Sequence, residues 1–169
     1  MPLTLPVGPC SGSDLAAART LCAMAIQQTL TDYGMKGMNL AHKTVLKVSG
    51  GRLGGTIGSM PVVQLHHTGR TSGKARTTML TAPIAEDGTY VLVASKGGDD
   101  RDPQWYLNLV ANPECELTVG DDTIECTARV ATEDEKNEMW PRIVKAYKGY
   151  AGYQEKTDRN IPVVICDPR

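Results

Sequence analysis

Two glycines and three cations are concentrated in one short turn, GRTSGKAR at residues 69–76. Glycines let the backbone turn sharply and let a ligand approach the main-chain N–H groups. The cations are Arg70, Lys74 and Arg76, and arginine binds phosphate or carboxylate through paired hydrogen bonds. The hydroxyl of Ser72 adds a further donor. The turn is therefore a candidate anion site, although a solvated basic hairpin turn explains this stretch alone equally well.

A second turn has a similar composition. SKGG, residues 95–98, follows a strand-like segment and again combines a cation, Lys96, with two glycines. If both turns lie at the same rim of a barrel, Arg70 and Arg76 converge with Lys96 on one ligand. That convergence would make the two turns a single anion-binding site.

The aromatic residues are unusual, because the chain has six tyrosines and no phenylalanine. Three of them, Tyr147, Tyr150 and Tyr153, fall in AYKGYAGYQ at a spacing that keeps them near one helical face. A pure core stripe would tolerate phenylalanine, so repeated phenols indicate a wet pocket or an interface. An amphipathic stripe that packs against the barrel is the alternative. Trp105 and Tyr106 are core residues by default, and otherwise the wall of a site for a flat ring.

The whole chain is nearly neutral, with a formal net charge of −1 over 169 residues. Hydrophobic residues make up 41% and charged residues 22%, which is typical of one soluble globular domain. A protein built mainly to hold nucleic acid is expected to be basic, so we expect no nucleic-acid partner. The positive charge is local, and it points to a small anionic ligand.

Neither a metal site nor a disulfide framework is indicated. The cysteines number five, an odd count, and none is spaced as C-x-x-C, so scattered thiols in a reducing cytoplasm are the plain interpretation. His66 and His67 are adjacent on a strand-like run, so their side chains point to opposite faces and do not easily share one metal ion. We expect a cytoplasmic protein without a metal.

The N-terminal segment has its own character. Residues 1–13 are expected to be disordered, and Asp14 is expected to cap a helix that ends near Tyr33. With Arg19 and two glutamines, residues 14–30 are too polar and too short to span a bilayer. A packing helix is favoured, and peripheral contact with a membrane or a partner is the other interpretation.

Segments with strand-like patterns predict about six strands, mostly in hairpins. They are residues 61–68, 76–85, 89–94, 115–120, 123–131 and 161–166. A helical piece over 38–49 and a glycine-rich loop over 50–59 precede them. No βαβ alternation is visible, so the predicted fold class is mainly β with helices (α+β), a small antiparallel barrel with attached helices.

Two later helices have clear start signals. Asp102 followed by Pro103 predicts the first, with Asp102 as the cap, and Pro113 ends it. Thr132 and Glu135 form a capping box that starts the second. The apolar face of the second helix is predicted from three residues at helical spacing, Met139, Ile143 and Tyr147.

Five stretches in order resemble one known family: HTGRTSGKAR, VASKGG, DPQWYLNLVANPE, a helix with WP and the three tyrosines, and TDRNIPVVICDP. Together they resemble the deazaflavin-dependent nitroreductase family, the split β-barrel reductases that use reduced coenzyme F420. Each stretch alone is weak evidence, whereas the combination is specific. The resemblance implies a split β-barrel similar to FMN-binding barrels, with an F420-binding domain over 37–169 behind a flexible segment and helix at 1–36.

The resemblance implies an enzyme, an F420-dependent oxidoreductase. It would transfer hydride from the reduced deazaflavin, F420H2, to an electron-poor small molecule, which is a quinone, an enone or a nitroaromatic compound. Coenzyme F420 carries a phosphate and a polyglutamate tail, and these anionic groups account for the cationic turn. Two alternatives stay open: a non-catalytic F420-binding protein, and an FMN-dependent oxidoreductase on the same barrel. A barrel of this type works as a monomer or a homodimer.

The resemblance also implies which residues form the site. Those expected to bind the cofactor are Arg70, Thr71, Ser72, Arg76, Thr77, Thr78, Met79, Leu80, Thr81, Ala94, Ser95, Lys96, Gln104, Trp105, Tyr106, Leu107, Asn108 and Tyr150. Those expected to act in catalysis are Tyr150 first, then Tyr147, Tyr153 and Ser95. Their role would be to donate a hydrogen bond to the acceptor oxygen as negative charge develops there.

Four positions depart from the usual pattern of that family. Thr71 stands where many relatives have lysine, and His66 and His67 replace a more usual pair of threonines. Thr81 stands where a relative that activates nitroimidazoles has an aromatic residue. These departures leave the cofactor expectation intact and weaken the expectation of nitroimidazole reduction.

Overall fold

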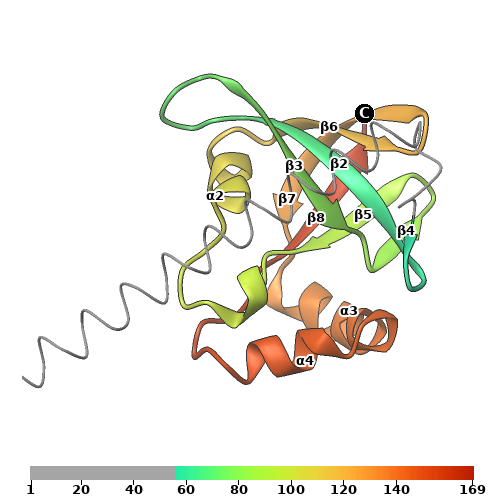
Figure 1. Ribbon diagram of the computed structural model, residues 1–169, viewed down its shortest axis with the longest axis vertical. Coiled ribbons are helices and arrows are strands. Elements are labelled where there is room, and N and C mark those ends of the chain that lie inside the picture. The colour runs from blue at the N-terminus through green and yellow to red at the C-terminus, as the bar shows by residue number, and fades with distance from the viewer. Residues whose placement is uncertain (1–55) are drawn as a thin grey trace, which may run out of the picture. The chain divides into compact units, whose positions relative to one another are not determined.

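A strongly curled antiparallel sheet forms the body of residues 56–169, the part of the chain that this computed structural model describes (Figure 1). The strands follow the order β1-β2-β6-β7-β8-β5-β4, and β3 pairs with β2 outside that path. Their bounds are β1 Thr56–Ile57, β2 Met60–Thr68, β3 Ala75–Thr81, β4 Ile84–Glu86, β5 Thr89–Val93, β6 Glu114–Val119, β7 Asp122–Val130 and β8 Val163–Pro168. All of these pairings are antiparallel, which confirms the predicted antiparallel barrel.

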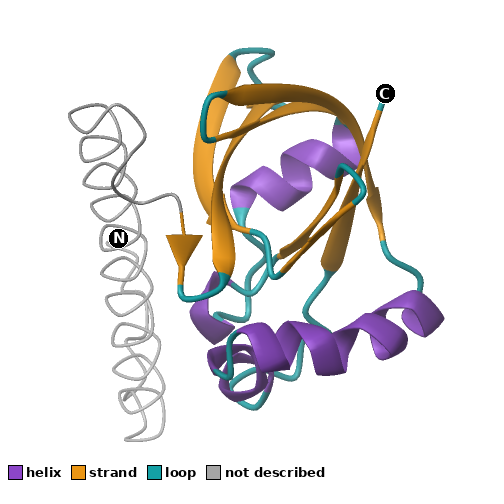
Figure 2. Ribbon diagram, turned by 90° about the vertical axis from the view of Figure 1, so that its right-hand side faces the viewer, coloured by secondary structure: helices purple, strands orange, loops and turns teal. Residues whose placement is uncertain are grey.

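Helical segments cover the ends of the curled sheet. They are the short 3₁₀ turn η1 Lys96–Gly98, α2 Gln104–Ala111, α3 Glu133–Ala146 and α4 Gly149–Gln154. The two views show α2 against the curl of the sheet, while α3 and α4 lie together at its other end (Figures 1 and 2). Helix α2 therefore packs against one face of the sheet, and α3 and α4 pack against the other face.

Two adjacent interior strands, β8 and β5, are buried on both faces. In β5, Leu92 belongs to the cluster that includes α2, whereas Val91 and Val93 belong to the cluster under α3 and α4. In β8, Val164 and Val163 divide in the same way. Successive strand residues point to opposite faces, so a continuous apolar run such as VVIC is what a strand between two cores requires.

Several predicted boundaries were wrong by a few residues, for local reasons. The predicted strand 76–85 is broken between β3 and β4 at Pro83, which lacks the N–H that a ladder needs. The predicted loop 50–59 contains β1, which pairs with β2 at Thr56 and Ile57. The predicted last strand, 161–166, is displaced to β8 beyond Pro162 for the same reason as at Pro83. These changes raise the strand count from about six to eight within the described part.

Helix starts were predicted with mixed success. The capping box is confirmed, because the Thr132 hydroxyl accepts from the Glu135 N–H and the Glu135 carboxylate accepts from the Thr132 N–H. The predicted cap of α2 was wrong, since Pro103 occupies the cap position and the Asp102 carboxylate accepts a hydrogen bond from Arg159 instead. A tertiary charge partner has displaced the local cap.

The apolar face of α3 was predicted correctly except at its end. Ile143 is fully buried and Met139 packs beside it. Tyr147 is 43% exposed and lies beyond the last helical residue, in an extended conformation. The predictions for residues 1–13, 14–33 and 38–49, and the domain boundary near residue 36, lie outside the described residues.

We expect Leu65→Ala to lower the free energy of unfolding by about 2–5 kcal/mol, because the lost apolar burial and the residual cavity both count. Leu65 of β2 is 0% exposed and stands opposite Leu117 of β6. Urea unfolding followed by circular dichroism measures the change. Val110→Ala is the control, since Val110 is 59% exposed and should cost less than about 0.5 kcal/mol. Equal losses in the two variants would contradict this description of the core.

Candidate functional site

The first cationic turn is the tip of the hairpin between β2 and β3. The chain closes there through two backbone hydrogen bonds, Gly69 N–H to the Lys74 carbonyl at 2.9 Å and Gly73 N–H to the Gly69 carbonyl at 2.8 Å. Gly73 has a φ of +62°, a conformation that glycine adopts without strain. All side chains from residue 70 to 76 are exposed. The turn is thus a loop closed by backbone hydrogen bonds, and its cations face solvent.

Arg70 fixes this turn to helix α2. Its Nη1 donates to the Gln104 Oε1 at 2.9 Å and to the Asn108 Oδ1 at 3.2 Å. Its backbone N–H donates to the same Asn108 oxygen at 3.1 Å. Three residues that were predicted to bind the cofactor, from two separate elements, therefore lie in direct contact.

The positive charge of the turn is not neutralised locally. A Cβ added at Gly69 would lie 2.9 Å from the Arg76 Nε and 2.9 Å from the Ser72 Oγ, so the Arg76 side chain crosses close over the turn. Within residues 56–169, no carboxylate forms an ion pair with Arg70, Lys74 or Arg76. An exposed cationic loop with free guanidinium donors fits an anionic ligand.

The second turn differs in its electrostatics. Its Lys96 Nζ lies 3.7 Å from an Asp99 carboxylate oxygen, so this cation is partly compensated. Interaction with Arg101 and Lys96 holds the pKa of Asp99 at about 2, mainly through the Arg101 hydrogen bond. Asp99 therefore stays charged at neutral pH. The convergence of Lys96 with the cations of the first turn remains a prediction.

Close packing joins the second turn to helix α4. Gly98 has a φ of +84°, and a Cβ there would lie 2.8 Å from the Tyr153 carbonyl oxygen and 2.9 Å from the Lys156 Cβ. Both the backbone conformation and the lack of space require glycine. The second glycine of SKGG is therefore explained by the close approach of the α4 backbone to Gly98.

Arg159, which precedes β8, holds the second turn in place. Its Nη2 donates to the carbonyls of Ala94 at 3.1 Å, Ser95 at 3.2 Å and Asp99 at 3.2 Å, and its Nη1 donates to the Asp102 carboxylate at 2.8 Å. Sequence reasoning missed this residue. The only available signal was a lone arginine in the polar segment TDRN before the last strand, and such a residue is usually solvated.

The three tyrosines form one ring cluster, although not as a helical stripe. The ring centroids are 5.4 Å apart for Tyr147 and Tyr150, and 6.1 Å apart for Tyr150 and Tyr153. Tyr147 lies before α4, and a Cβ on Gly149 would lie 2.2 Å from the Tyr147 ring. The Tyr147 ring therefore lies over Gly149. The predicted helical spacing of the three tyrosines holds for Tyr150 and Tyr153 and was wrong for Tyr147, which is not in the helix.

Each phenol of the cluster has a different environment. Tyr150 is 6% exposed, and its hydroxyl lies 3.3 Å from the Thr81 Oγ1 of β3. The hydroxyls of Tyr147 and Tyr153 lie 3.4 Å apart. Burial raises the pKa of Tyr150, and the hydrogen bond with Tyr147 followed by burial raises the pKa of Tyr153 to about 12. Both groups keep their protons at neutral pH and can serve as donors.

Other predicted site residues have mainly structural surroundings. Met79 and Trp105 are buried, and Leu80 and Tyr106 pack against the cluster around α2. The ring of Trp105 meets Tyr106 edge-on at 6.4 Å. Ala94 is fully buried, and its carbonyl is bonded to Arg159. The default core interpretation therefore describes Trp105 in this structure.

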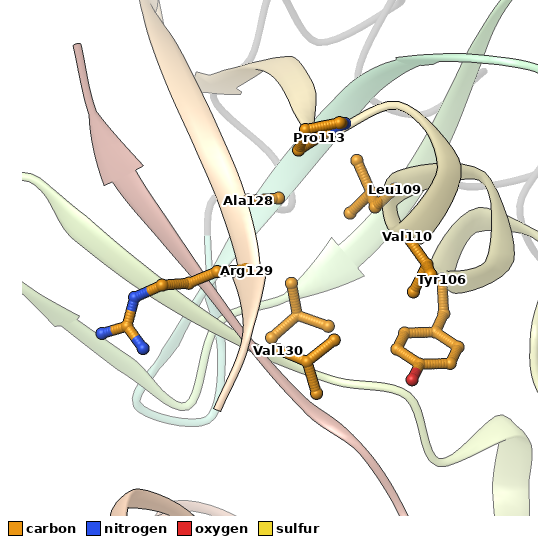
Figure 3. A pocket seen from close by; sticks show the side chains of 8 residues that line it. Tyr106, Leu109, Val110, Pro113, Ala128, Arg129 and Val130 are labelled. Carbon is orange, nitrogen blue, oxygen red and sulfur yellow. The ribbon is translucent and has the colours of Figure 1, made fainter. Parts of the chain in front are cut away.

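An apolar pocket of about 160 Å³ lies between α2 and β7, apart from the cationic turn. Its lining residues are Tyr106, Leu109, Val110, Pro113, Ala128, Arg129, Val130 and Val164 (Figure 3). Only Tyr106 among them was predicted to be part of the site.

The described residues also limit other kinds of site. No group of three or more histidine, cysteine or acidic side chains within 56–169 is arranged to hold a metal ion. In the same range, no helix has the length and apolar character needed to cross a bilayer.

We expect Arg159→Met to destabilise the protein by about 2 kcal/mol or more, since several hydrogen bonds of a charged group are lost together. Hydrogen exchange should become faster at the amides of residues 95–102, which the guanidinium holds. Arg159→Lys should slow the exchange of these amides only partly relative to Arg159→Met, because an ammonium group lacks the planar arrangement of donors of a guanidinium. Arg142→Met, which breaks the exposed pair with Glu86, is the control and should leave this exchange unchanged. Unchanged exchange in Arg159→Met would show that the hydrogen bonds of Arg159 do not hold the second turn.

Comparison with known proteins places this arrangement in a family. The chain is 40% identical over 134 residues to the F420H(2)-dependent quinone reductase Rv1261c of Mycobacterium tuberculosis (strain ATCC 25618 / H37Rv), covering 76% of this chain and 88% of the relative. A solved structure described as F420-H2 dependent reductase FDR-A is 44% identical, with a TM-score of 0.58 over 63% of this chain and 94% of that one. A further solved structure, described as a domain-swapped dimer, is 39% identical, with a TM-score of 0.60 over 74% of this chain and 98% of that one.

These likenesses confirm the expected fold, a split β-barrel of the FMN-binding type. The model of the family described as F420H(2)-dependent quinone reductase matches residues 39–168. That range contains both turns, Arg159 and the tyrosine cluster. The chain belongs to the F420H2-dependent quinone reductase family.

Proposed function

We propose that this protein is an oxidoreductase that uses reduced coenzyme F420 to reduce quinones. The observation that carries the proposal is the uncompensated cationic turn, held on α2 by Arg70, in a chain of the F420H2-dependent quinone reductase family. Within residues 56–169 the three cations of the turn have no carboxylate partner, which favours a small anionic ligand over a merely solvated turn.

The donors of the first turn fit the anionic end of the cofactor. Arg70, Arg76 and the Ser72 hydroxyl would hold the phosphate and the polyglutamate tail, with Thr71 and the backbone N–H groups beside them. In this assignment β3, from Thr77 to Thr81, would run along the deazaflavin. The second turn, Ala94 to Lys96, and the α2 residues from Gln104 to Asn108 would complete the binding surface. Arg159 would act indirectly, by fixing the second turn.

The cofactor supplies the hydride when it is bound. The protein would orient the two reactants and stabilise the negative charge that develops on the acceptor oxygen. Neutral phenols suit that task, because a donor with a raised pKa gives a hydrogen bond without losing its proton. We assign the donor role to Tyr150, with Tyr147, Tyr153 and Ser95 as the other candidates. Thr81 can donate to the Tyr150 oxygen, which would leave the phenol proton free for the acceptor.

The finer assignments concern the acceptor and the assembly. A quinone is the acceptor named for the family, whereas enones and nitro compounds are further candidates to be screened. One solved relative is described as a domain-swapped dimer, so a homodimer is a candidate state beside the monomer. Peripheral membrane contact through the helix that the sequence predicts near the N-terminus is a proposal that rests on sequence alone.

Coenzyme F420 should quench the tryptophan fluorescence of the purified protein in a saturable titration, and FMN should produce little response. Addition of F420H2 and a soluble naphthoquinone should then give turnover that is absent without protein. Preference for FMN would support the flavin alternative, and tight F420 binding without turnover on a broad acceptor panel would support a non-catalytic carrier.

Arg70→Gln should weaken F420 binding by about 10- to 100-fold, because charge-assisted hydrogen bonds contribute about 1.5–3 kcal/mol. The same titration, repeated at low and high salt, measures the loss and its electrostatic origin. Lys145→Gln is the control, since Lys145 is an exposed cation near the end of α3. Equal affinities for the two variants would remove the first turn from the cofactor site.

Tyr150→Phe should lower kcat for quinone reduction on the order of 100-fold, the usual effect of removing a donor to a developing oxyanion. F420 affinity should stay within a few-fold, because the phenyl ring is retained. Tyr90→Phe is the matched control, a half-buried phenol of β5 outside the site. If Tyr147→Phe carries the loss while Tyr150→Phe does not, the exposed phenol is the donor.

A further inference from the structure

A chain of hydrogen bonds leads from β3 through a buried histidine to the cationic turn. The His67 Nε2 lies 3.2 Å from the Thr78 Oγ1, and the His67 Nδ1 lies 3.2 Å from the Asn108 Nδ2. The Asn108 Oδ1 then accepts from both the backbone and the guanidinium of Arg70. His67 and Asn108 are 6% and 4% exposed, so water does not substitute easily for these partners.

The donors and acceptors of this chain leave one consistent arrangement. Because the Asn108 oxygen accepts two bonds from Arg70, its amide NH2 must face His67. The amide donates to the His67 Nδ1, which therefore carries a lone pair. The remaining ring proton is on Nε2 and is donated to the Thr78 hydroxyl. A protonated imidazole would place one N–H against another.

We propose that neutral His67 is a positioning residue that holds the Asn108 amide in the orientation which aims Arg70 at the anionic end of coenzyme F420. This inference rests on the proposed function of the first turn and adds a residue that does not itself touch the cofactor. When His67 gains a proton, the Asn108 amide must turn, and its oxygen leaves Arg70. Affinity for the cofactor should then fall in acid.

The charges around His67 favour the neutral ring. Arg76 is its cross-strand partner on β3, His66 is its neighbour on β2, and Arg70 lies beyond Asn108. Burial, then the charge of Arg76, then that of His66 lower the pKa of His67 below its usual 6.5. The ring therefore stays neutral at neutral pH. Because an unfolded chain takes up this proton more readily, stability too should decrease as the pH falls below about 6.5.

The adjacent histidine provides a matched control. His66 points to the other face of β2, where its ring nitrogens lie 3.2 Å from the Thr77 Oγ1 and 3.1 Å from the Thr118 Oγ1. None of these bonds leads to Asn108 or Arg70. Both positions carry histidine, so the comparison separates a role in the network from the mere presence of an imidazole.

The first measurement is a long-range ¹H–¹⁵N spectrum of the histidine side chains in the cofactor-free protein at pH 7.5. We expect His67 to be the neutral tautomer with its proton on Nε2. A charged ring, or a proton on Nδ1, would overturn the proposal. This result does not depend on whether the protein binds F420.

The second measurement is the Kd for F420 of the unmodified protein and three variants, by fluorescence titration from pH 8 down to the lowest pH at which each protein stays folded. His67→Phe should weaken binding about 3- to 10-fold at pH 8, the usual effect of one lost hydrogen bond. His67→Gln should restore most of the affinity through its amide oxygen and lose the acid dependence that the unmodified protein shows. His66→Gln should keep the affinity and retain an acid dependence, with its midpoint moved to higher pH because the charge of His66 no longer lowers the pKa of His67. Urea unfolding checks that each variant is folded.

A folded His67→Phe that binds F420 as tightly as the unmodified protein, or a folded His67→Gln that keeps the acid dependence, would overturn the proposal. If His67→Phe does not fold, the comparison of the two glutamine variants still decides. If instead the cationic turn does not bind F420, the results differ. Arg70→Gln would then bind F420 normally, while the His67 tautomer would remain as expected.

Discussion

The burial of β5 and β8 on both faces is the constraint on which this structure depends. Each strand serves two cores, one shared with α2 and the other with α3 and α4. The two cores fix the elements that carry the site, because the cationic turn is bonded to α2 and the tyrosine cluster lies on and beside α4. Two strands thus set the relative positions of the cationic turn and the tyrosine cluster.

The ends of those two strands meet at Arg159. Its guanidinium binds the carbonyls of Ala94 and Ser95 at the end of β5, and the residue itself leads into β8. Backbone carbonyls that turn away from a sheet need donors, and a planar fork supplies several at once. The second turn is therefore held by a side chain that is remote in sequence, with Gly98 admitting the backbone of α4 on its other side.

The two turns differ in how far their positive charge is compensated by neighbouring side chains. In the second, Asp99 lies beside Lys96 and Arg101, so the positive charge is partly compensated within the protein. In the first, Arg70 is oriented by neutral amides, Gln104 and Asn108, which fix its direction and leave its charge intact. Orientation by neutral acceptors is what a binding arginine needs, since a carboxylate partner would compete with an anionic ligand. The His67 network extends this neutral support into the core.

The sequence by itself determined the features that depend on neighbours along the chain. The hairpin turn at Gly69–Arg76, the capping box at Thr132 and the apolar strands followed from local spacing, and the five stretches of the resemblance indicated the barrel and the cofactor. Contacts between distant residues were decided only by the tertiary structure. Asp102 was expected to cap α2 and instead binds Arg159, 57 residues away, because a charged partner outweighs a cap. The roles of Arg159 and His67 were hidden for the same reason: their partners come from other strands and helices, and no local pattern specifies which elements the sheet brings together.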